Sequence, residues 1–205
     1  RFMTSHPKDL SEEMILAMAE CRHVCKQIHL PVQSGSNAIL KAMNRKYTRE
    51  HYLMLVDKLR AAMPDIGITT DLIAGFPGET EQDHRDTLAL MAQVRFDAAF
   101  TFAYSPRKGT PAASMEDAIP QEVKQRRLCE LIEQQKNESQ KRYQALVGTE
   151  QQVLVEGHSK KDIHQATGKI DRGRTVNFNQ GTKPAMPGDF VKVRITQAKA
   201  NTLFG

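Results

Sequence analysis

Apolar and polar residues follow one another along the first 142 positions in a pattern that predicts strands and helices in turn. Short apolar runs predict buried strands over residues 27–32, 66–73 and 96–104. Apolar residues spaced three or four positions apart predict helices over residues 11–24, 36–43, 49–62, 81–94 and 120–146. Such alternation is typical of a parallel sheet covered by helices, so we expect an α/β fold for this part of the chain.

The pattern changes after Gly148, where no helical period remains. Short strands are predicted over residues 151–156, 176–179 and 190–195, and the turns between them contain Gly, Asp, Lys and Pro. This pattern is typical of a small antiparallel β-barrel of OB-like size. We therefore expect two domains, residues 1–142 and residues 143–205, joined through the long helix.

Several predicted helices begin at a residue that suits a helix terminus. Ser11 and Thr48 can accept a hydrogen bond from the first turn of the helices that follow them. Thr80 and Asp83 have the spacing of a reciprocal capping pair. Pro120 suits the first turn of the last helix, because its missing N–H has no partner there in any case.

Polar groups lie at the ends of two predicted strands. Gln33 and Asp71 each follow an apolar run at the predicted end of a strand, and glycine-containing turns lie at 33–36 and 75–80. Polar side chains at the C-terminal ends of strands are where parallel βα barrels place their chemistry. An amide and a carboxylate there could bind ribose hydroxyls, but both residues could equally serve only to form turns.

Arg45 follows the short helix predicted over residues 36–43. A guanidinium at this position could hold a carboxylate in a bidentate pair. The alternative is that Arg45 is simply a cation at a helix C-terminus, where the helix dipole favours positive charge.

The cysteines and histidines do not form a recognisable metal motif. Cys21, Cys25 and Cys129 are few and odd in number, which argues against a disulfide framework. In a three-cysteine cluster motif a third thiolate would stand at the position of Ile28. Cys21 and Cys25 are also spaced to share one helix face, so we expect both to be structural. Cys129 is expected in the protein core, on the buried face of its helix. We also predict no ligand role for His6, His23, His51, His84, His158 and His164.

Positive charge is concentrated in the last part of the chain. The formal net charge is +5, and residues 143–205 contain nine Lys and Arg against five Asp and Glu, a net of +4. This imbalance is a sign of a polyanionic partner, although surface lysines are most often simply solvated. The candidate RNA contacts in turns between the predicted strands are Lys160, Lys161, Arg172, Arg174 and Lys183. Phe178 could stack on a base, although a phenylalanine in a strand is more often core.

No apolar stretch approaches the roughly 20 residues that a membrane-spanning helix needs. We find no secretory leader pattern either, so a cytoplasmic protein that does not bind membranes is expected. The chain starts at Arg1, and residues 2–4 have the pattern of a strand end. We therefore expect it to be the C-terminal part of a longer protein.

Taken together, the motifs resemble those of the radical S-adenosylmethionine methylthiotransferases over essentially the whole chain. The matching segments are residues 4–7, 29–36, 43–45, 71–80, 104–110, 187–193 and 203–205. The resemblance implies the second half of a radical S-adenosylmethionine barrel, a partial (β/α) TIM-like barrel, followed by a TRAM domain that binds RNA. The sequence around Lys169 to Arg174 departs from the TRAM pattern, which leaves individual RNA contacts open.

Within this family, two features favour the branch that modifies tRNA. These are the Ser34-Gly35-Ser36 turn and the basic Arg107-Lys108 pair. The resemblance then implies methylthiolation at C2 of N6-isopentenyladenosine, next to the anticodon. The alternatives are the branch that methylthiolates a ribosomal protein and a bare RNA-binding module that has lost catalysis.

The resemblance also implies cofactors, partners and site residues. Gln33 and Asp71 would contact the ribose of S-adenosylmethionine and Arg45 its carboxylate, with Thr4 and Ser5 lining the same pocket. The family uses two 4Fe–4S clusters, whose ligands would precede Arg1, so this chain alone is expected to be inactive and no catalytic residue is assigned. The implied partners are a tRNA anticodon stem-loop carrying isopentenyladenosine and an electron donor such as flavodoxin, and a monomer is expected.

Overall fold

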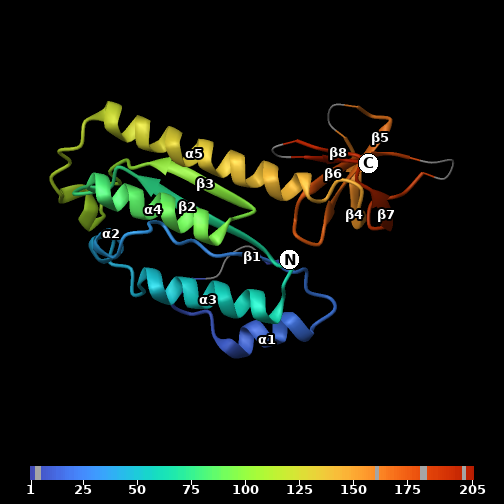
Figure 1. Cartoon of the computed structure of the whole chain (residues 1–205), viewed down its shortest axis with the longest axis horizontal. Helices are drawn as coiled ribbons and strands as arrows, with labels where there is room; N and C mark the ends of the chain where they lie inside the picture. Colours follow the sequence, from blue (N-terminus) through green and yellow to red (C-terminus); the bar gives the residue numbers. More distant parts are fainter. Residues whose placement is uncertain (3–5, 160–161, 181–183, 200–201) are drawn as a thin grey trace.

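The computed structural model describes residues 1–2, 6–159, 162–180, 184–199 and 202–205. It consists of an α/β half and a β-rich half, with the long helix α5 running from one to the other (Figure 1). The α/β half contains α1 (Glu12–Glu20), β1 (Gln27–His29), α2 (Asn37–Ala42), α3 (Arg49–Ala62), β2 (Gly67–Ala74), α4 (Glu81–Val94), β3 (Ala98–Ala103), the 3₁₀ turn η1 (Pro111–Ser114) and α5 (Gln121–Gln144). The β-rich half contains β4 (Glu150–His158), β5 (Gln165–Ile170), β6 (Thr175–Asn179), β7 (Phe190–Arg194), β8 (Gln197–Ala198) and β9 (Leu203–Phe204).

The first sheet is parallel and has the strand order β1-β2-β3. Its two faces differ because successive side chains of a strand point in opposite directions. On one face, apolar residues such as Ile28, Ile68 and Leu72 are fully buried in a core shared with α3, α4 and α5. On the other face, Thr69, Asp71 and their neighbours are only partly covered. We call this second surface the inner face.

Two predicted helices have the bounds that the sequence pattern indicates. Thr48 caps α3 by accepting a hydrogen bond from the His51 N–H, and α3 covers residues 49–62 as predicted. Helix α4 covers residues 81–94, also as predicted, and begins with a complete capping box between Thr80 and Asp83. These helices follow the pattern because their start signals lie in the local sequence.

Helix α1 was predicted to reach Val24 but ends at Glu20. The Lys26 ammonium donates to the carbonyls of Met18 and Ala19, at 2.5 and 2.9 Å. It therefore satisfies carbonyl groups that a continuing helix would have used. The spacing of apolar residues could not predict this end, because Lys26 lies six residues beyond the helix.

The second sheet has the order β7-β4-β5-β6-β9-β8, and its apolar side chains form a separate core with Tyr143. The prediction of a purely antiparallel barrel was wrong in one respect, because β9 pairs with β6 in parallel. The end of the chain turns back after β8 to reach this position. Strand β5 was not predicted, since its sequence Gln-Ala-Thr-Gly-Lys-Ile offers only two apolar side chains, Ala166 and Ile170.

The turns that follow β1 and β2 are joined by hydrogen bonds through α4. The Gly35 N–H donates to Thr87 Oγ1 at 2.9 Å, and Ser36 Oγ donates to Asp83 Oδ1 at 2.5 Å. Gly35 allows this close approach, since a Cβ there would lie 2.5 Å from the Asp86 carbonyl oxygen. The two turns therefore keep a fixed relative position.

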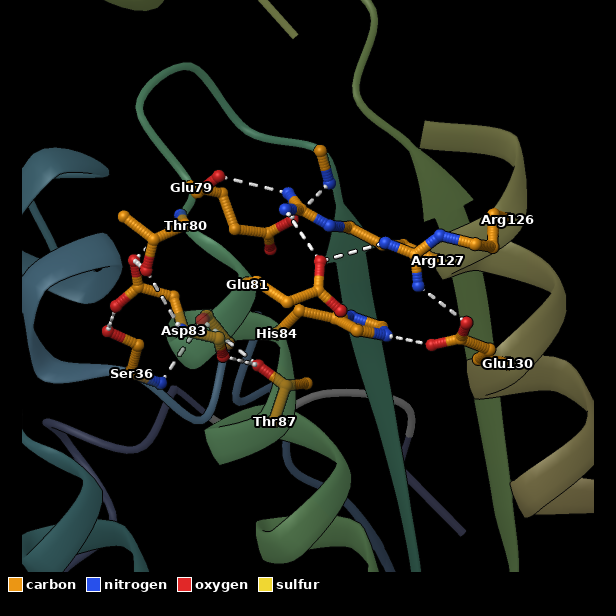
Figure 2. Close-up of polar contacts among 12 residues, drawn as sticks. Ser36, Glu79, Thr80, Glu81, Asp83, His84, Thr87, Arg126, Arg127 and Glu130 are labelled. Carbon is orange, nitrogen blue, oxygen red and sulfur yellow. Dashed lines mark hydrogen bonds and ion pairs between the residues drawn. The ribbon is translucent and has the colours of Figure 1, made fainter. Parts of the chain in front are cut away.

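A buried ion pair ties the second turn to α5 (Figure 2). Arg127 Nη1 lies 2.8 Å from Glu79 Oε2, and the same carboxylate oxygen accepts the Gly75 N–H at 2.8 Å. Burial raises the pKa of Glu79, while the Gly75 amide and the Arg127 guanidinium act in the opposite direction. Around this pair, Glu81 contacts both Arg126 and Arg127, and buried His84 bonds Glu130 at 2.7 Å. These contacts hold α4 against α5.

Among the described residues, none of the helices combines the length and apolar character that a membrane crossing requires.

We predict that Arg127→Met destabilises the chain by about 3–5 kcal/mol, because it leaves the Glu79 carboxylate buried without its partner. Urea unfolding followed by circular dichroism measures the change. Arg126→Ala is the matched control: its ion pairs are exposed to solvent, and we expect its loss to change the stability little.

The double variant Glu79→Gln with Arg127→Met should recover part of the lost stability, since no charge is then left unpaired in the interior. Equal stability of Arg127→Met and Arg126→Ala would contradict the role given to the buried pair.

Candidate functional site

The inner face of the parallel sheet brings together the polar and aromatic groups that are candidates for ligand binding. The register aligns Asp71 with Phe100 and Ile73 with Phe102 across β2 and β3. Phe100 and Phe102 are 55% and 54% exposed, whereas Ile68, Thr70 and Leu72 on the opposite face of β2 are fully buried. A half-exposed sheet face that carries a carboxylate beside aromatic rings can hold a ligand with both polar and apolar parts.

Asp71 lies within β2 rather than in the turn beyond it, and it is paired with a histidine. Its Oδ2 is 3.5 Å from His29 Nε2, and His29 Nδ1 lies 2.9 Å from Thr69 Oγ1. Both side chains remain partly accessible. The remaining lone pairs of the carboxylate oxygens can therefore accept hydrogen bonds from hydroxyl groups of a ligand.

His29 is a candidate that the motif analysis did not single out. The signal was present, because strict alternation along β1 places residues 27 and 29 on the face opposite buried Ile28. Its position beside Asp71 follows from the pairing of His29 with Thr69 across the two strands.

Gln33 adopts a left-handed backbone conformation, with φ at 71°. Its N–H donates to the Asp71 carbonyl at 2.9 Å, and its own carbonyl accepts the Ile73 N–H at 3.0 Å. The structure therefore brings Gln33 next to Asp71, as the strand-end prediction requires. A non-glycine residue with positive φ is uncommon and costs conformational free energy, so the surroundings must hold it in place.

Arg45 lies near the same strand end and contains an orphaned donor. Its Nε is buried and has no hydrogen-bond partner within the described part of the chain. Arg45 is adjacent to Tyr47, whose pKa is raised to about 12 by burial and pulled the other way by the Arg45 charge. The Tyr47 hydroxyl donates to the carbonyls of Pro31 and Val32, directly before Gln33. An incoming carboxylate would satisfy the buried donor of Arg45.

Five of the predicted contact residues lie outside the described residues: Thr4, Ser5, Lys160, Lys161 and Lys183.

Arg174 faces the α/β half of the chain. Its guanidinium lies 3.9 Å from the centre of the Tyr143 ring and donates to the Asp97 carbonyl at 2.8 Å. Burial lowers the pKa of Arg174 to about 10, with the charge of Asp97 opposing this. The sequence pattern placed Arg174 only on a turn between strands, and a role in RNA binding stays a prediction for this residue.

Arg172 also faces the α/β half, where it pairs with Asp65 at 2.5 Å. The turn that holds both arginines meets the inner face at the end where its strands begin, and it closes a cleft of about 260 Å³. Its lining residues are Gln27, His29, Thr69, Asp97, Ala98, Phe100, Arg172, Gly173 and Arg174. This cleft connects the inner face to the β-rich half.

The cysteines differ in part from expectation. Cys129 was expected in the core but is exposed, because α5 buries the face that carries Lys124, Arg127 and Leu131. Cys21 is exposed and terminates α1, so it does not share a helix with Cys25. No group of three or more His, Cys, Asp and Glu that could hold a metal ion is found among the described residues. Phe178 is buried in the core of the second sheet, which confirms the structural alternative for it.

Comparison with known proteins assigns both halves. Residues 1–91 match the model of the radical SAM superfamily, and residues 144–205 match that of the TRAM domain. The tRNA-2-methylthio-N(6)-dimethylallyladenosine synthase of Clostridium novyi is 51% identical over all 205 residues, and that of Thermoanaerobacter sp. is 52% identical over the same length. The chain spans about 45% and 43% of these relatives.

A solved structure supports the fold independently of close sequence similarity. Coproporphyrinogen III oxidase from Escherichia coli, a radical SAM enzyme, matches 82% of this chain with a TM-score of 0.56 at 15% identity, over 44% of its own length. The prediction of a partial TIM-like barrel followed by a small β-barrel is thereby confirmed. The chain matches a radical SAM domain over residues 1–91 and a TRAM domain over residues 144–205, and over its whole length it is similar to radical SAM methylthiotransferases that act on tRNA.

Proposed function

We propose that the protein methylthiolates tRNA at C2 of N6-isopentenyladenosine (also called N6-dimethylallyladenosine) next to the anticodon, using S-adenosylmethionine. The observation that carries this proposal is about 50% identity along the entire chain to synthases named for this reaction. The combination of a radical SAM domain with a TRAM domain supports it.

The inner face and the strand ends supply groups that suit S-adenosylmethionine. The Asp71 carboxylate accepts hydrogen bonds from ribose hydroxyls, and His29 holds that carboxylate in place at 3.5 Å. The buried Nε of Arg45 fits a carboxylate such as that of the methionine moiety. Gln33, whose backbone bonds β2 next to Asp71, is the second proposed ribose contact. Thr4 and Ser5 complete the proposed pocket.

When bound together with an iron–sulfur cluster, S-adenosylmethionine supplies the radical chemistry of this family. We include two 4Fe–4S clusters in the proposal, held by residues of the protein outside this chain. The described residues contribute the binding surface and keep one side of it dry through the packed core behind β2.

The TRAM domain is the proposed site for the tRNA backbone. Residues 143–205 have nine cations against five anions, and Lys160, Lys161 and Lys183 are the proposed phosphate contacts, with Arg172 and Arg174 on the side that faces the sheet. We further propose an electron donor such as flavodoxin, a monomeric state and a cytoplasmic location.

The proposed reaction is tested by nucleoside mass spectrometry of bulk tRNA from cells that lack the gene for the full-length protein. We expect N6-isopentenyladenosine to accumulate and its 2-methylthio derivative to disappear, with restoration by the wild-type gene. An unchanged tRNA profile would contradict the proposal, and a missing methylthio group on a ribosomal protein would then identify the alternative branch.

Replacing Arg45 by Ala in the full-length protein should weaken S-adenosylmethionine binding by about 10- to 100-fold, the range for losing a charge-assisted hydrogen bond. Equilibrium dialysis measures the affinity, and the ultraviolet–visible spectrum of the cluster should not change. Lys46→Ala, a neighbouring exposed cation, is the control. Equal affinities of the two variants would remove the assigned role of Arg45.

RNA affinity should fall with salt, with log Kd changing by about 0.7 per phosphate contact for each tenfold change in salt. The double variant Lys160→Ala with Lys161→Ala should lower this slope by about 1.4. Lys58→Ala serves as the control, because Lys58 pairs with Glu12 on the outer side of α3. Filter binding at several salt concentrations gives the slopes, and a flat response in the wild type would count against RNA as the partner.

A further inference from the structure

Residues 105–119, which connect β3 to α5 and include η1, form a structured loop beyond the end of the parallel sheet (Figure 1). We call this segment the strand-end loop. It begins with a turn in which the N–H and Oγ1 of Thr110 both donate to the Arg107 carbonyl, at 3.1 and 2.8 Å. Gly109 has a φ of 87°, which a glycine adopts without steric cost. The turn therefore gives Arg107 and Lys108 defined backbone positions.

Two side chains attach the strand-end loop to the sheet and to α5. Tyr104, directly after β3, donates from its Oη to the Ala112 carbonyl at 2.9 Å. The buried ammonium of Lys124 pairs with Asp117. Lys124 also packs against Gly75, where a Cβ would clash with the lysine side chain. The strand-end loop is thus fixed at two points and lies against the turn after β2.

Arg107 and Lys108 carry positive charge that the described part of the chain does not pair. Both residues are exposed, and neither side chain makes a hydrogen bond or ion pair with another described residue. The acidic residues of the loop, Glu116 and Asp117, come after η1, and Asp117 is already paired with Lys124. Two adjacent cations on a fixed turn are suited to bind a polyanion.

We propose that the strand-end loop is a second contact site for the tRNA backbone, with Arg107 and Lys108 binding phosphates. The inference rests on the proposed function and adds a site that is separate from the TRAM domain. The strand-end loop precedes α5, whereas the TRAM domain follows it (Figure 1). Because α5 has 24 residues and a helix rises about 1.5 Å per residue, the two sites are separated by about 36 Å along its axis.

The two sites together favour a nucleic acid as the occupant. The TRAM end of the molecule has an excess of positive charge, and the strand-end loop presents a further pair of cations. A nucleic acid carries a phosphate on every nucleotide, so an RNA stem-loop presents negative charge along its whole length. A small anion could occupy only one of the two sites, whereas a stem-loop can contact both.

The position of the loop also suits the proposed reaction. Strands β1, β2 and β3 are parallel, so the strand-end loop lies at the same end of the sheet as Gln33. Gln33 belongs to the proposed S-adenosylmethionine site. Phosphates held by Arg107 and Lys108 would therefore keep the RNA next to that site, while the TRAM domain holds another part of the same RNA.

The test measures binding of an anticodon stem-loop RNA that carries N6-dimethylallyladenosine to the full-length, cluster-loaded protein at several salt concentrations. Arg107→Ala with Lys108→Ala should lower the slope of log Kd against log salt by about 1.4, since each phosphate contact contributes about 0.7. The affinity at low salt should fall at least about 10-fold. The affinity for S-adenosylmethionine should not change. Arg107→Lys, which keeps the charge, should keep the slope.

Arg85→Ala with Lys136→Ala is the matched control. It removes the same two charges from exposed positions on α4 and α5, and it should leave the slope unchanged. Fluorescence anisotropy gives the affinities, and thermal unfolding of each variant is measured in parallel.

Two results would overturn the inference. If Arg107→Ala with Lys108→Ala changes the slope no more than the control does, the strand-end loop binds no phosphates. If this variant lowers the unfolding temperature and leaves the slope unchanged, another part of the protein covers the two cations. Failure of the proposed function has a different signature, since the wild type would then not methylthiolate the RNA, whatever the slopes of the variants.

Discussion

The buried ion pair between Glu79 and Arg127 joins the turn after β2 to helix α5. Because the carboxylate also accepts the Gly75 N–H, the glycine-rich turn cannot shift without exposing an unpaired charge. The turn after β2 also fixes the start of α4. Helix α4 then fixes the turn after β1 through the hydrogen bond between Thr87 and Gly35. The positions of Gln33 and the neighbouring strand ends therefore depend on one ion pair that lies on the far side of the sheet from the inner face.

Helix α5, which carries Arg127, also links the two halves of the chain near its C-terminal end. The Asp97 carbonyl, just before β3, accepts hydrogen bonds from Ser139 Oγ, Tyr143 Oη and Arg174. One backbone oxygen thus connects the parallel sheet, helix α5 and the TRAM domain. Its neighbour, the Asp97 carboxylate, also accepts the Ile68 N–H at 3.0 Å. Since these groups are buried, water competes weakly with them.

Local signals explain which parts of this structure the sequence predicts. The bounds of α3 and α4 follow from Thr48 and Thr80, residues that act within one turn of their own positions. The proximity of Gln33 to Asp71 follows from their predicted places at two strand ends, which a parallel sheet must bring to one edge. In each case the determining contact is close in sequence or imposed by the topology.

The parts that could not be predicted depend on contacts between distant residues. Arg174 carries no mark that distinguishes it from an RNA-binding cation, because its partners Tyr143 and Asp97 are 31 and 77 positions away. Helix α1 ends early through Lys26, and β5 forms only because neighbouring strands β4 and β6 pair with it. Exposure of Cys129 depends on which face of α5 the sheet covers.

The contact of Arg174 with Tyr143 and Asp97 has a consequence for how the molecule meets a large ligand. A ligand that touches both halves makes its second contact without a further diffusional encounter, so the effective concentration of the second site depends on the geometry of the joint. Because the contact between the halves is buried, the distance between the two sites varies little. The effective concentration is therefore high only for ligands whose two contact points match that distance. Ligand shape is then selected by the spacing between the halves as well as by the chemistry of either one.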